Sequence, residues 1–236
     1  MNAHRLILWN IDHTLVDVGR VTREAYAEAF QKVTGRPLVK LPPTAGRTES
    51  EIVFETLAFN GMVTDDDSLE TFLTALGEAF AVRRDKVRAH GRVLPGALEA
   101  LSAVRVLPGV VQSALTGSLE SSARVKLAEL GLDRQLDLDV AGFYSPVYPK
   151  GAMIETARIR TRKKYQTTVA ERTTVFVADH PLDVRAGQIA YAGVIAVATG
   201  AATEAELRAS GAEVVLPTLA DTGAVVRAVE MLTRRT

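Results

Sequence analysis

Polar side chains suited to binding a metal ion and an anion follow several short apolar runs, at positions where the strands of a sheet would end. Carboxylate and amide oxygens are hard donors of the kind that bind Mg²⁺, which keeps several waters and shares its coordination sphere with phosphate. The carboxyl ends of parallel strands meet at one edge of a sheet, so residues distant in the sequence converge there. The candidates for a metal site are Asn10, Asp12, Asp179 and Asp183.

A second group of residues could bind the oxygens of a phosphoryl group. Thr116 and Gly117 follow an apolar run at residues 110–115, where we expect a helix to begin. The free backbone N–H groups of a helix N-terminus bind anions, and Lys150 adds a point charge for the same oxygens. Together the two groups are complementary to a phosphoryl group in transfer.

Each of these residues also has an ordinary structural explanation. Asp12 could be a turn residue, Thr116 a helix cap, and Asp183 an acid in the first turn of a helix. Lys150 could be a surface lysine, and Asp179 could merely end a strand. The site interpretation is favoured because all of them fall at predicted strand ends on one rim of one sheet.

The elements that must position these residues follow from the apolar runs. Runs rich in β-branched and aliphatic residues, each bounded by turn residues, predict buried parallel strands. We expect strands at residues 5–9, 110–115, 138–141, 174–178, 194–197 and 213–216. Helical patterns separate the later runs, at residues 119–130, 151–160, 182–192 and 204–210. This alternation predicts an α/β fold with a doubly wound, Rossmann-like parallel sheet.

The segment between the first two expected strands breaks the alternation. It has helical periodicity without a convincing strand, and we expect helices at residues 23–34, 50–60 and 67–88. We therefore predict a catalytic core of residues 1–18 and 92–236 and an inserted all-helical cap of residues 19–91. Such a block lies above the carboxyl ends of the strands, in the position of a lid.

The composition limits the partners and the chemistry. With 28 Lys and Arg against 28 Asp and Glu among 236 residues, no overall field points to nucleic acid or a membrane as a partner. The absence of cysteine excludes disulfides, thiolate catalysis and cysteine-bound zinc, and is compatible with the cytoplasmic location that we expect. The apolar run before Asn10 is too short for a signal peptide or a membrane span.

Four short segments carry motifs in a fixed order. They are LILWNIDHTL at residues 6–15, LTGS at residues 115–118, Lys150, and VADHPLD at residues 177–183. This set resembles the four signatures of the haloacid dehalogenase-like hydrolase superfamily and spans the chain. The helical insertion is similar to the cap of the subgroup that includes β-phosphoglucomutase and phosphoglycolate phosphatase-like enzymes. Its GRTE segment at residues 46–49 resembles the part of the cap that faces the substrate.

The resemblance implies a role for each matched residue. Position 10 would be the nucleophile that becomes an aspartyl phosphate, and Asp12 the acid/base that protonates the leaving group and then activates water. Thr116 and Lys150 would hold the phosphoryl oxygens. Asp12 also favours phosphate over halide chemistry, because the dehalogenases proper lack this second carboxylate.

The resemblance further implies Mg²⁺ as the cofactor. Asp179 and Asp183 would bind it, with the side-chain oxygen of residue 10 and the backbone carbonyl of Asp12. The expected activity is that of a Mg²⁺-dependent phosphatase acting on a small phosphorylated metabolite, of the sugar-phosphate or nucleoside-phosphate class. A phosphomutase is an alternative.

Residue 10 is the serious departure from the family pattern, because it is asparagine. A neutral carboxamide is a very poor nucleophile, so the chain as written should be nearly inactive. Three explanations stay open: an Asp-to-Asn change introduced to trap a substrate, a natural pseudoenzyme that binds a phosphorylated ligand, or an asparagine recruited for another reaction. His13, where glycine is commonest, is a smaller departure.

The cap holds the candidates for contacts that select the substrate. These are Arg47, Thr48 and Glu49, although they could merely cap or solvate the helix that begins near Ser50. The amphipathic helix expected at residues 23–34 could pack on the core or on a second chain, so a monomer and a homodimer both stay open.

Overall fold

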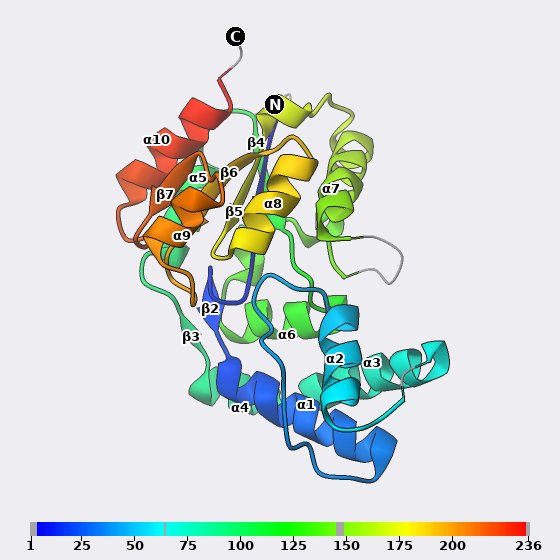
Figure 1. Cartoon of the computed structure of the whole chain (residues 1–236). Helices are drawn as coiled ribbons and strands as arrows, with labels where there is room; N and C mark the ends of the chain where they lie inside the picture. Colours follow the sequence, from blue (N-terminus) through cyan, green and yellow to red (C-terminus); the bar gives the residue numbers. More distant parts are fainter. Residues whose placement is uncertain (1–3, 64, 145–148, 235–236) are drawn as a thin grey trace.

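The computed structural model describes residues 4–63, 65–144 and 149–234. A parallel sheet crosses its centre (Figure 1), with the strands in the order β4-β1-β5-β6-β7. The strands are β1 (Arg5–Trp9), β4 (Val110–Ala114), β5 (Thr174–Ala178), β6 (Gly193–Val197) and β7 (Val214–Leu216). Because β1 pairs with both β4 and β5, the residues that follow these three strands are neighbours at one edge. The expected doubly wound α/β fold is confirmed.

Side chains of β1 alternate between two hydrophobic clusters, one on each face of the sheet. Ile7 and Trp9 belong to the cluster formed with α5, α6 and α10, whereas Leu6 and Leu8 belong to the cluster formed with α7. A strand buried on both faces reads as a continuous apolar run, which is why its sequence is recognisable. The core helices are α5 (Ala97–Arg105), α6 (Glu120–Glu129), α7 (Lys150–Tyr165), α8 (Pro181–Ile189), α9 (Glu204–Ala209) and α10 (Thr222–Leu232).

Four helices lie together at the end of the sheet where β1 leads into β2 (Figure 1). They are α1 (Gly19–Thr34), α2 (Glu49–Phe59), α3 (Asp66–Ala81) and α4 (Arg84–His90), and they follow β2 (Val16–Asp17) and precede β3 (Arg92–Val93). β2 and β3 pair as a short antiparallel ribbon. α1, α2 and α3 enclose a hydrophobic cluster of their own. We propose this ribbon as the boundary between a core of residues 1–18 and 92–236 and a cap of residues 19–91.

Residues 138–141 do not form the expected strand. A short 3₁₀ helix, η2 (Leu138–Val140), stands there, because the Asp137 side chain accepts a hydrogen bond from the Asp139 N–H and starts a turn. A single bridge between Leu115 and Gly142 is the only sheet pairing in this stretch of the described residues. The other 3₁₀ helices are η1 (Asp133–Gln135) and η3 (Glu171–Thr173).

The single helix expected at residues 67–88 is two helices, α3 and α4. Phe80, near the end of α3, packs into the cap cluster, whereas Val87 of α4 packs into the main core cluster. The break at residues 82–83 allows the two side chains to enter different clusters. The acidic run before α3 is the expected helix start, since Asp65 accepts a hydrogen bond from the Ser68 N–H.

No helix in the described ranges is long and apolar enough to cross a membrane.

Candidate active site

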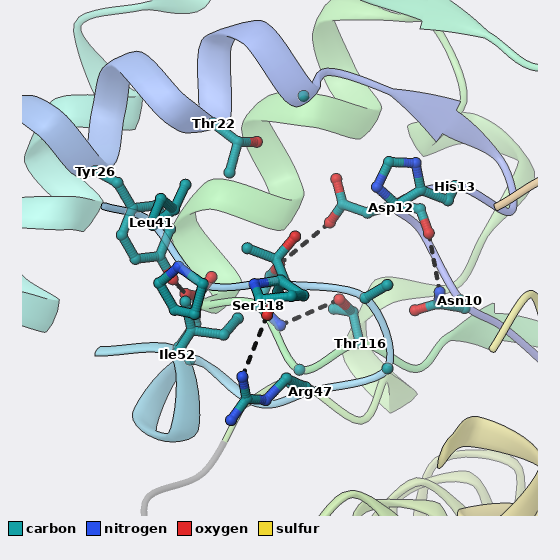
Figure 2. A pocket seen from close by; sticks show the side chains of 18 of the residues that line it. Asn10, Asp12, His13, Thr22, Tyr26, Leu41, Arg47, Ile52, Thr116 and Ser118 are labelled. Atoms are coloured by element: carbon teal, nitrogen blue, oxygen red, sulfur yellow. Dashed lines mark hydrogen bonds between the residues drawn. The ribbon is translucent and has the colours of Figure 1, made fainter. Parts of the chain in front are cut away.

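A cavity of about 380 Å³ opens where the ends of the central strands face the cap. Figure 2 shows Tyr26, Leu41 and Ile52 of the cap on one side of it, and Asp12 and His13 of the core on the other. The sequence-predicted residues that line the cavity are Asn10, Asp12, Arg47, Glu49, Thr116, Gly117 and Lys150.

Asp179 and Asp183 lie beneath that lining and are buried. Asp179 contacts Asn10, and Asp183 contacts Lys150. The structure therefore brings the predicted core residues together at one rim of the sheet, as the strand-end argument requires.

Asn10 is buried immediately after β1. Its backbone N–H donates to the carbonyl oxygen of Val177, which keeps residue 10 in line with the sheet. The side-chain Nδ2 donates to the backbone oxygen of Asp12 at 3.0 Å and to Asp179 Oδ1 at 2.9 Å. A carbonyl oxygen and an ionised carboxylate only accept hydrogen bonds, so the nitrogen of the amide must face them. The amide oxygen, which we expected as a metal ligand, points away from these two atoms.

The carboxylates of Asp179 and Asp183 are only partly satisfied. Thr14 Oγ donates to Asp179 Oδ1 at 2.8 Å, and Lys150 Nζ lies 2.5 Å from Asp183 Oδ1. Asp179 Oδ2 and Asp183 Oδ2 have no hydrogen-bond partner among the described residues, and Asp183 Oδ1 has only its ion pair with Lys150. Burial, together with the charge of Asp183, raises the pKa of Asp179, although hydrogen bonds from Thr14 and Asn10 oppose this effect.

These unsatisfied oxygens bear on the expected metal. Buried carboxylate oxygens without a partner are uncommon, and a divalent cation with oxygen ligands would satisfy them. Within the described residues no cluster of three or more His, Asp or Glu side chains could hold a metal. The two carboxylates fit Mg²⁺ provided that neutral oxygens, such as the backbone carbonyl of Asp12, complete the set. A turn of the Asn10 amide would add its side-chain oxygen.

The side chain of Asp12 contacts Lys126 of α6 and Ser118 of the turn before α6. Its Oδ2 lies 2.6 Å from Lys126 Nζ and 3.3 Å from Ser118 Oγ, and Figure 2 shows the contact with Ser118. Lys126 also lines the cavity and was missed by sequence reasoning. The available signal was a charged residue on the buried stripe of α6, which includes Ala123 and Leu127.

Thr116 lies after β4, but the helix begins later than we expected. α6 starts at Glu120 with Leu119 as its N-cap, so Thr116 and Gly117 belong to the connecting turn. Thr116 Oγ accepts a hydrogen bond from the Ser118 N–H at 3.1 Å, which orders that turn beside the cavity. The prediction of a helix N-terminus at Thr116 is therefore wrong, because Thr116 and Gly117 lie in a turn that precedes the first residue of α6.

The cap segment approaches Gly117 very closely. The Glu49 N–H donates to the Gly117 carbonyl oxygen at 3.0 Å, and a Cβ atom on Gly117 would lie 2.1 Å from the Arg47 carbonyl oxygen. Only a residue without a side chain leaves room for this contact. The segment at residues 46–49 is thus held against the site by its backbone.

The three cap candidates lie in different environments. Arg47 lines the cavity but pairs with Glu55, its Nη1 lying 2.7 Å from Glu55 Oε2. Thr48 precedes α2, where its N–H and Oγ both donate to Glu51, and it does not line the cavity. Thr48 is therefore the N-cap of α2, which was the alternative to a substrate contact. Glu49 alone turns a buried carboxyl toward the cavity.

Glu49 forms a buried pair with Tyr26 of α1, whose hydroxyl donates to Glu49 Oε2. Burial raises the pKa of Glu49, while the Tyr26 hydrogen bond and the charge of Lys126 act in the opposite direction. Burial and the negative charge of Glu49 also raise the pKa of Tyr26. Sequence reasoning missed Tyr26, because an aromatic residue on the buried face of an amphipathic helix looks like a core residue.

A comparison with models of protein families identifies the family of the chain. A family model described as haloacid dehalogenase-like hydrolase matches residues 7–188, which is more than half of the chain. The chain belongs to the haloacid dehalogenase-like hydrolase family. The resemblance seen in the four motifs is thereby confirmed. A search of curated proteins gives no significant match.

Several solved structures share the fold of this chain. A hydrolase from Pseudomonas syringae is 18% identical with a TM-score of 0.69, covering 95% of this chain and 98% of the other. A predicted phosphoglycolate phosphatase from Haemophilus somnus is 17% identical with a TM-score of 0.67, covering 96% and 99%. A candidate β-phosphoglucomutase from Bacteroides vulgatus is 18% identical with a TM-score of 0.68, covering 98% and 91%. At these identities the likeness shows a shared fold that extends over nearly the whole of each chain.

Within the haloacid dehalogenase-like motif, His13 occupies a left-handed backbone conformation with φ of 62°. Glycine adopts this conformation without strain, whereas a side chain costs roughly 1–2 kcal/mol. The turn is held by the Thr199 hydroxyl, which donates to the His13 carbonyl oxygen at 2.6 Å. The histidine is tolerated because its backbone is fixed from outside the turn.

Proposed function

We propose that the site is that of a Mg²⁺-dependent phosphatase for small phosphate monoesters of the sugar-phosphate or nucleoside-phosphate class, and that Asn10 leaves the chain as given nearly inactive. Membership of the haloacid dehalogenase-like hydrolase family supports a hydrolytic reaction. The observation that carries the proposal is the convergence of residue 10, Asp12, Thr116 and Lys150 on one cavity.

With aspartate at position 10, the proposed reaction has two steps. The carboxylate of residue 10 forms a bond to phosphorus, the bond from phosphorus to the ester oxygen breaks, and that oxygen takes a proton from Asp12. Asp12 then removes a proton from water, whose oxygen forms a bond to the phosphorus while the bond from phosphorus to the carboxylate oxygen of residue 10 breaks. Inorganic phosphate and the free carboxylate are released. Thr116 and Lys150 bind the phosphoryl oxygens during both steps.

Asp179 and Asp183 would hold the Mg²⁺ ion, with the side-chain oxygen of residue 10 and the backbone carbonyl oxygen of Asp12. The bound ion would neutralise charge on the phosphoryl oxygens. For this set to form, the amide of Asn10 must turn its oxygen inward and give up its hydrogen bonds to Asp12 and Asp179.

The substrate would enter between this site and the cap. Glu49 and Arg47 line the cavity from the cap, so they are the proposed contacts for the polar atoms of the leaving group. A cavity of about 380 Å³ suits a small metabolite.

Asn10 also supports a second candidate function, that of a pseudoenzyme that binds a phosphorylated ligand without hydrolysing it. A carboxamide lacks the charge and nucleophilicity for attack on phosphorus, yet Asp12, Thr116 and Lys150 still line the cavity. A phosphomutase is a third candidate, since the same covalent intermediate could return its phosphoryl group to another hydroxyl.

A panel of phosphate esters assayed with the Asn10→Asp chain and Mg²⁺ separates these candidates. Release of inorganic phosphate supports the phosphatase, and an isomeric phosphate ester without free phosphate supports the mutase. If the Asn10→Asp chain is inert toward the whole panel while a panel member binds in equilibrium dialysis, the binding function replaces the proposal.

A further inference from the structure

Lys126 of α6 has almost no access to solvent, since only 2% of the residue is exposed. A buried ammonium group is costly unless it is paired and hydrogen-bonded. Its Nζ lies 2.6 Å from Asp12 Oδ2 and 3.3 Å from Ser118 Oγ, and Ser118 Oγ lies 3.3 Å from the same Asp12 oxygen. Two hydrogen-bond donors therefore meet at one oxygen of the Asp12 carboxyl group.

The other oxygen of the Asp12 carboxyl group, Oδ1, is available to a ligand in the cavity. The Asp12 side chain is 29% exposed and lines the cavity. Every side-chain hydrogen bond of Asp12 given by the described residues falls on Oδ2. A carboxyl group held at Oδ2 can neither rotate freely nor swing out of the site, and it keeps Oδ1 for a ligand in the cavity.

Lys126 also lies where the core meets the cap. Its ammonium group is 5.1 Å from the ring centroid of Phe80, a buried residue of α3, and α6 packs against α3 and α4. A cation over an aromatic face is attracted to it, more strongly when water is excluded. The cap thus supplies one wall of the pocket that confines the Lys126 ammonium group beside Asp12.

We propose that Lys126 is a positioning residue that fixes the Asp12 carboxyl group for proton transfer to the leaving-group oxygen. This inference rests on the acid/base role proposed for Asp12. Placement is critical, because proton transfer needs hydrogen-bond distance and a displacement of about 1 Å can cost roughly a hundredfold in rate.

A comparison of two esters in the Asn10→Asp background separates positioning from a merely structural ion pair. p-Nitrophenolate leaves as a stable anion without a proton, whereas the alkoxide of glycerol 2-phosphate needs one. The value of kcat/KM covers the steps up to departure of this group. We expect Lys126→Met to lower kcat/KM for glycerol 2-phosphate by about tenfold to a hundredfold, and for p-nitrophenyl phosphate by less than about threefold.

Two further variants complete this experiment. Lys126→Arg keeps the charge and should recover part of the loss on glycerol 2-phosphate. Arg124→Met removes another cation from α6. The Arg124 side chain is 44% exposed and pairs with Glu120, so its loss should change kcat/KM for neither ester. Equal losses on the two esters after Lys126→Met, or no loss on glycerol 2-phosphate, would overturn the proposal.

A second measurement needs no turnover and uses the chain with Asn10. Lys126→Met and Asp12→Asn are made singly and together, and unfolding in urea gives a double-mutant cycle. We expect a coupling of at least about fivefold in the unfolding equilibrium constant, because the two groups are in direct contact. Absence of coupling contradicts the proposal. If the Asn10→Asp chain hydrolyses neither ester, the proposed function fails, and the cycle still decides whether Lys126 holds Asp12.

Discussion

The Nδ2 atom of Asn10 lies 2.9 Å from Oδ1 of Asp179 and donates a hydrogen bond to it. The same nitrogen reaches the backbone oxygen of Asp12 at 3.0 Å. Two oxygens proposed as metal ligands are therefore joined by a neutral amide. A carboxylate at residue 10 could not make either contact, because it has no proton to donate.

Asn10→Asp should consequently make the stability of the protein depend on Mg²⁺. Without a metal, two buried carboxylates would face each other beside a carbonyl oxygen, which we expect to lower the free energy of unfolding by about 3 kcal/mol. Addition of Mg²⁺ should restore most of this loss, whereas the chain with Asn10 should respond much less. Urea unfolding in EDTA and in Mg²⁺ measures both effects.

The matched control is Asn60→Asp, outside the site. Asn60 Nδ2 donates to the carbonyl oxygens of Lys40 and Thr56, so this change also removes donors from an amide. Its loss of stability should be the same with and without Mg²⁺. An Asn10→Asp chain that is as stable in EDTA as its parent would show that residue 10 does not face these carboxylates.

Gly117→Ala tests the close approach of the cap segment to the core. The new Cβ would lie 2.1 Å from the Arg47 carbonyl oxygen, a contact that forces the segment to move. We expect a loss of about 1–3 kcal/mol in stability and faster proteolysis between α1 and α2. Gly19→Ala is the control, because its Cβ would lie 3.4 Å from the nearest atom, in ordinary contact. Equal behaviour of the two variants would contradict the observed packing.

Glu49→Gln should stabilise the protein increasingly as the pH rises. Burial raises the pKa of Glu49 above its ordinary value of 4.5, so the folded protein binds this proton more readily than the unfolded chain does. The stability of the parent chain therefore falls as the pH rises from that value through the raised pKa, and the Gln variant avoids this loss. Urea unfolding between pH 5 and pH 8 should show that the free energy of unfolding of the Glu49→Gln variant increasingly exceeds that of the parent chain.

Glu55→Gln is a control for which we expect the opposite dependence of stability on pH. The hydrogen bond from Arg47 lowers the pKa of Glu55, whose side chain is 40% exposed, so its contribution to stability is present above the ordinary pKa and is lost as the pH falls. Removing the Glu55 carboxyl group should lower the free energy of unfolding more at pH 8 than at low pH. If the difference in free energy of unfolding between the Glu49→Gln variant and the parent does not change with pH, the Glu49 carboxyl group is not buried as described.

The strands of the sheet could be predicted because they are buried on both faces. The apolar runs of β1 and β5 leave few alternatives, and the ends of these runs predict that Asn10 and Asp179 lie side by side, as they do in the structure. Residues 138–141 have a similar apolar character, but a short run cannot reveal that a capping hydrogen bond from Asp139 to Asp137 makes a turn there. The break between α3 and α4 was hidden for a related reason, since helical periodicity continues across it.

The part of the site that could not be predicted consists of contacts between residues far apart in the chain. Lys126 and Asp12 are 114 positions apart in the sequence. Neither a lysine on a helix nor an aspartate after a strand indicates which residue it will contact. Tyr26 and Glu49 likewise meet only when α1 packs against the first residue of α2. Motifs indicated the chemistry at the strand ends, whereas packing between the cap and the core decided what surrounds it.

Turnover by two chains that differ only at residue 10 tests the central claim most directly. The Asn10→Asp chain and the chain as given are compared with p-nitrophenyl phosphate, each in Mg²⁺ and in EDTA. We predict Mg²⁺-dependent release of p-nitrophenolate by the aspartate form, faster than by the asparagine form by a factor on the order of a thousand or more. Equal rates from the two chains, or no release from the aspartate form, would contradict the assignment of residue 10 as the nucleophile of a phosphatase.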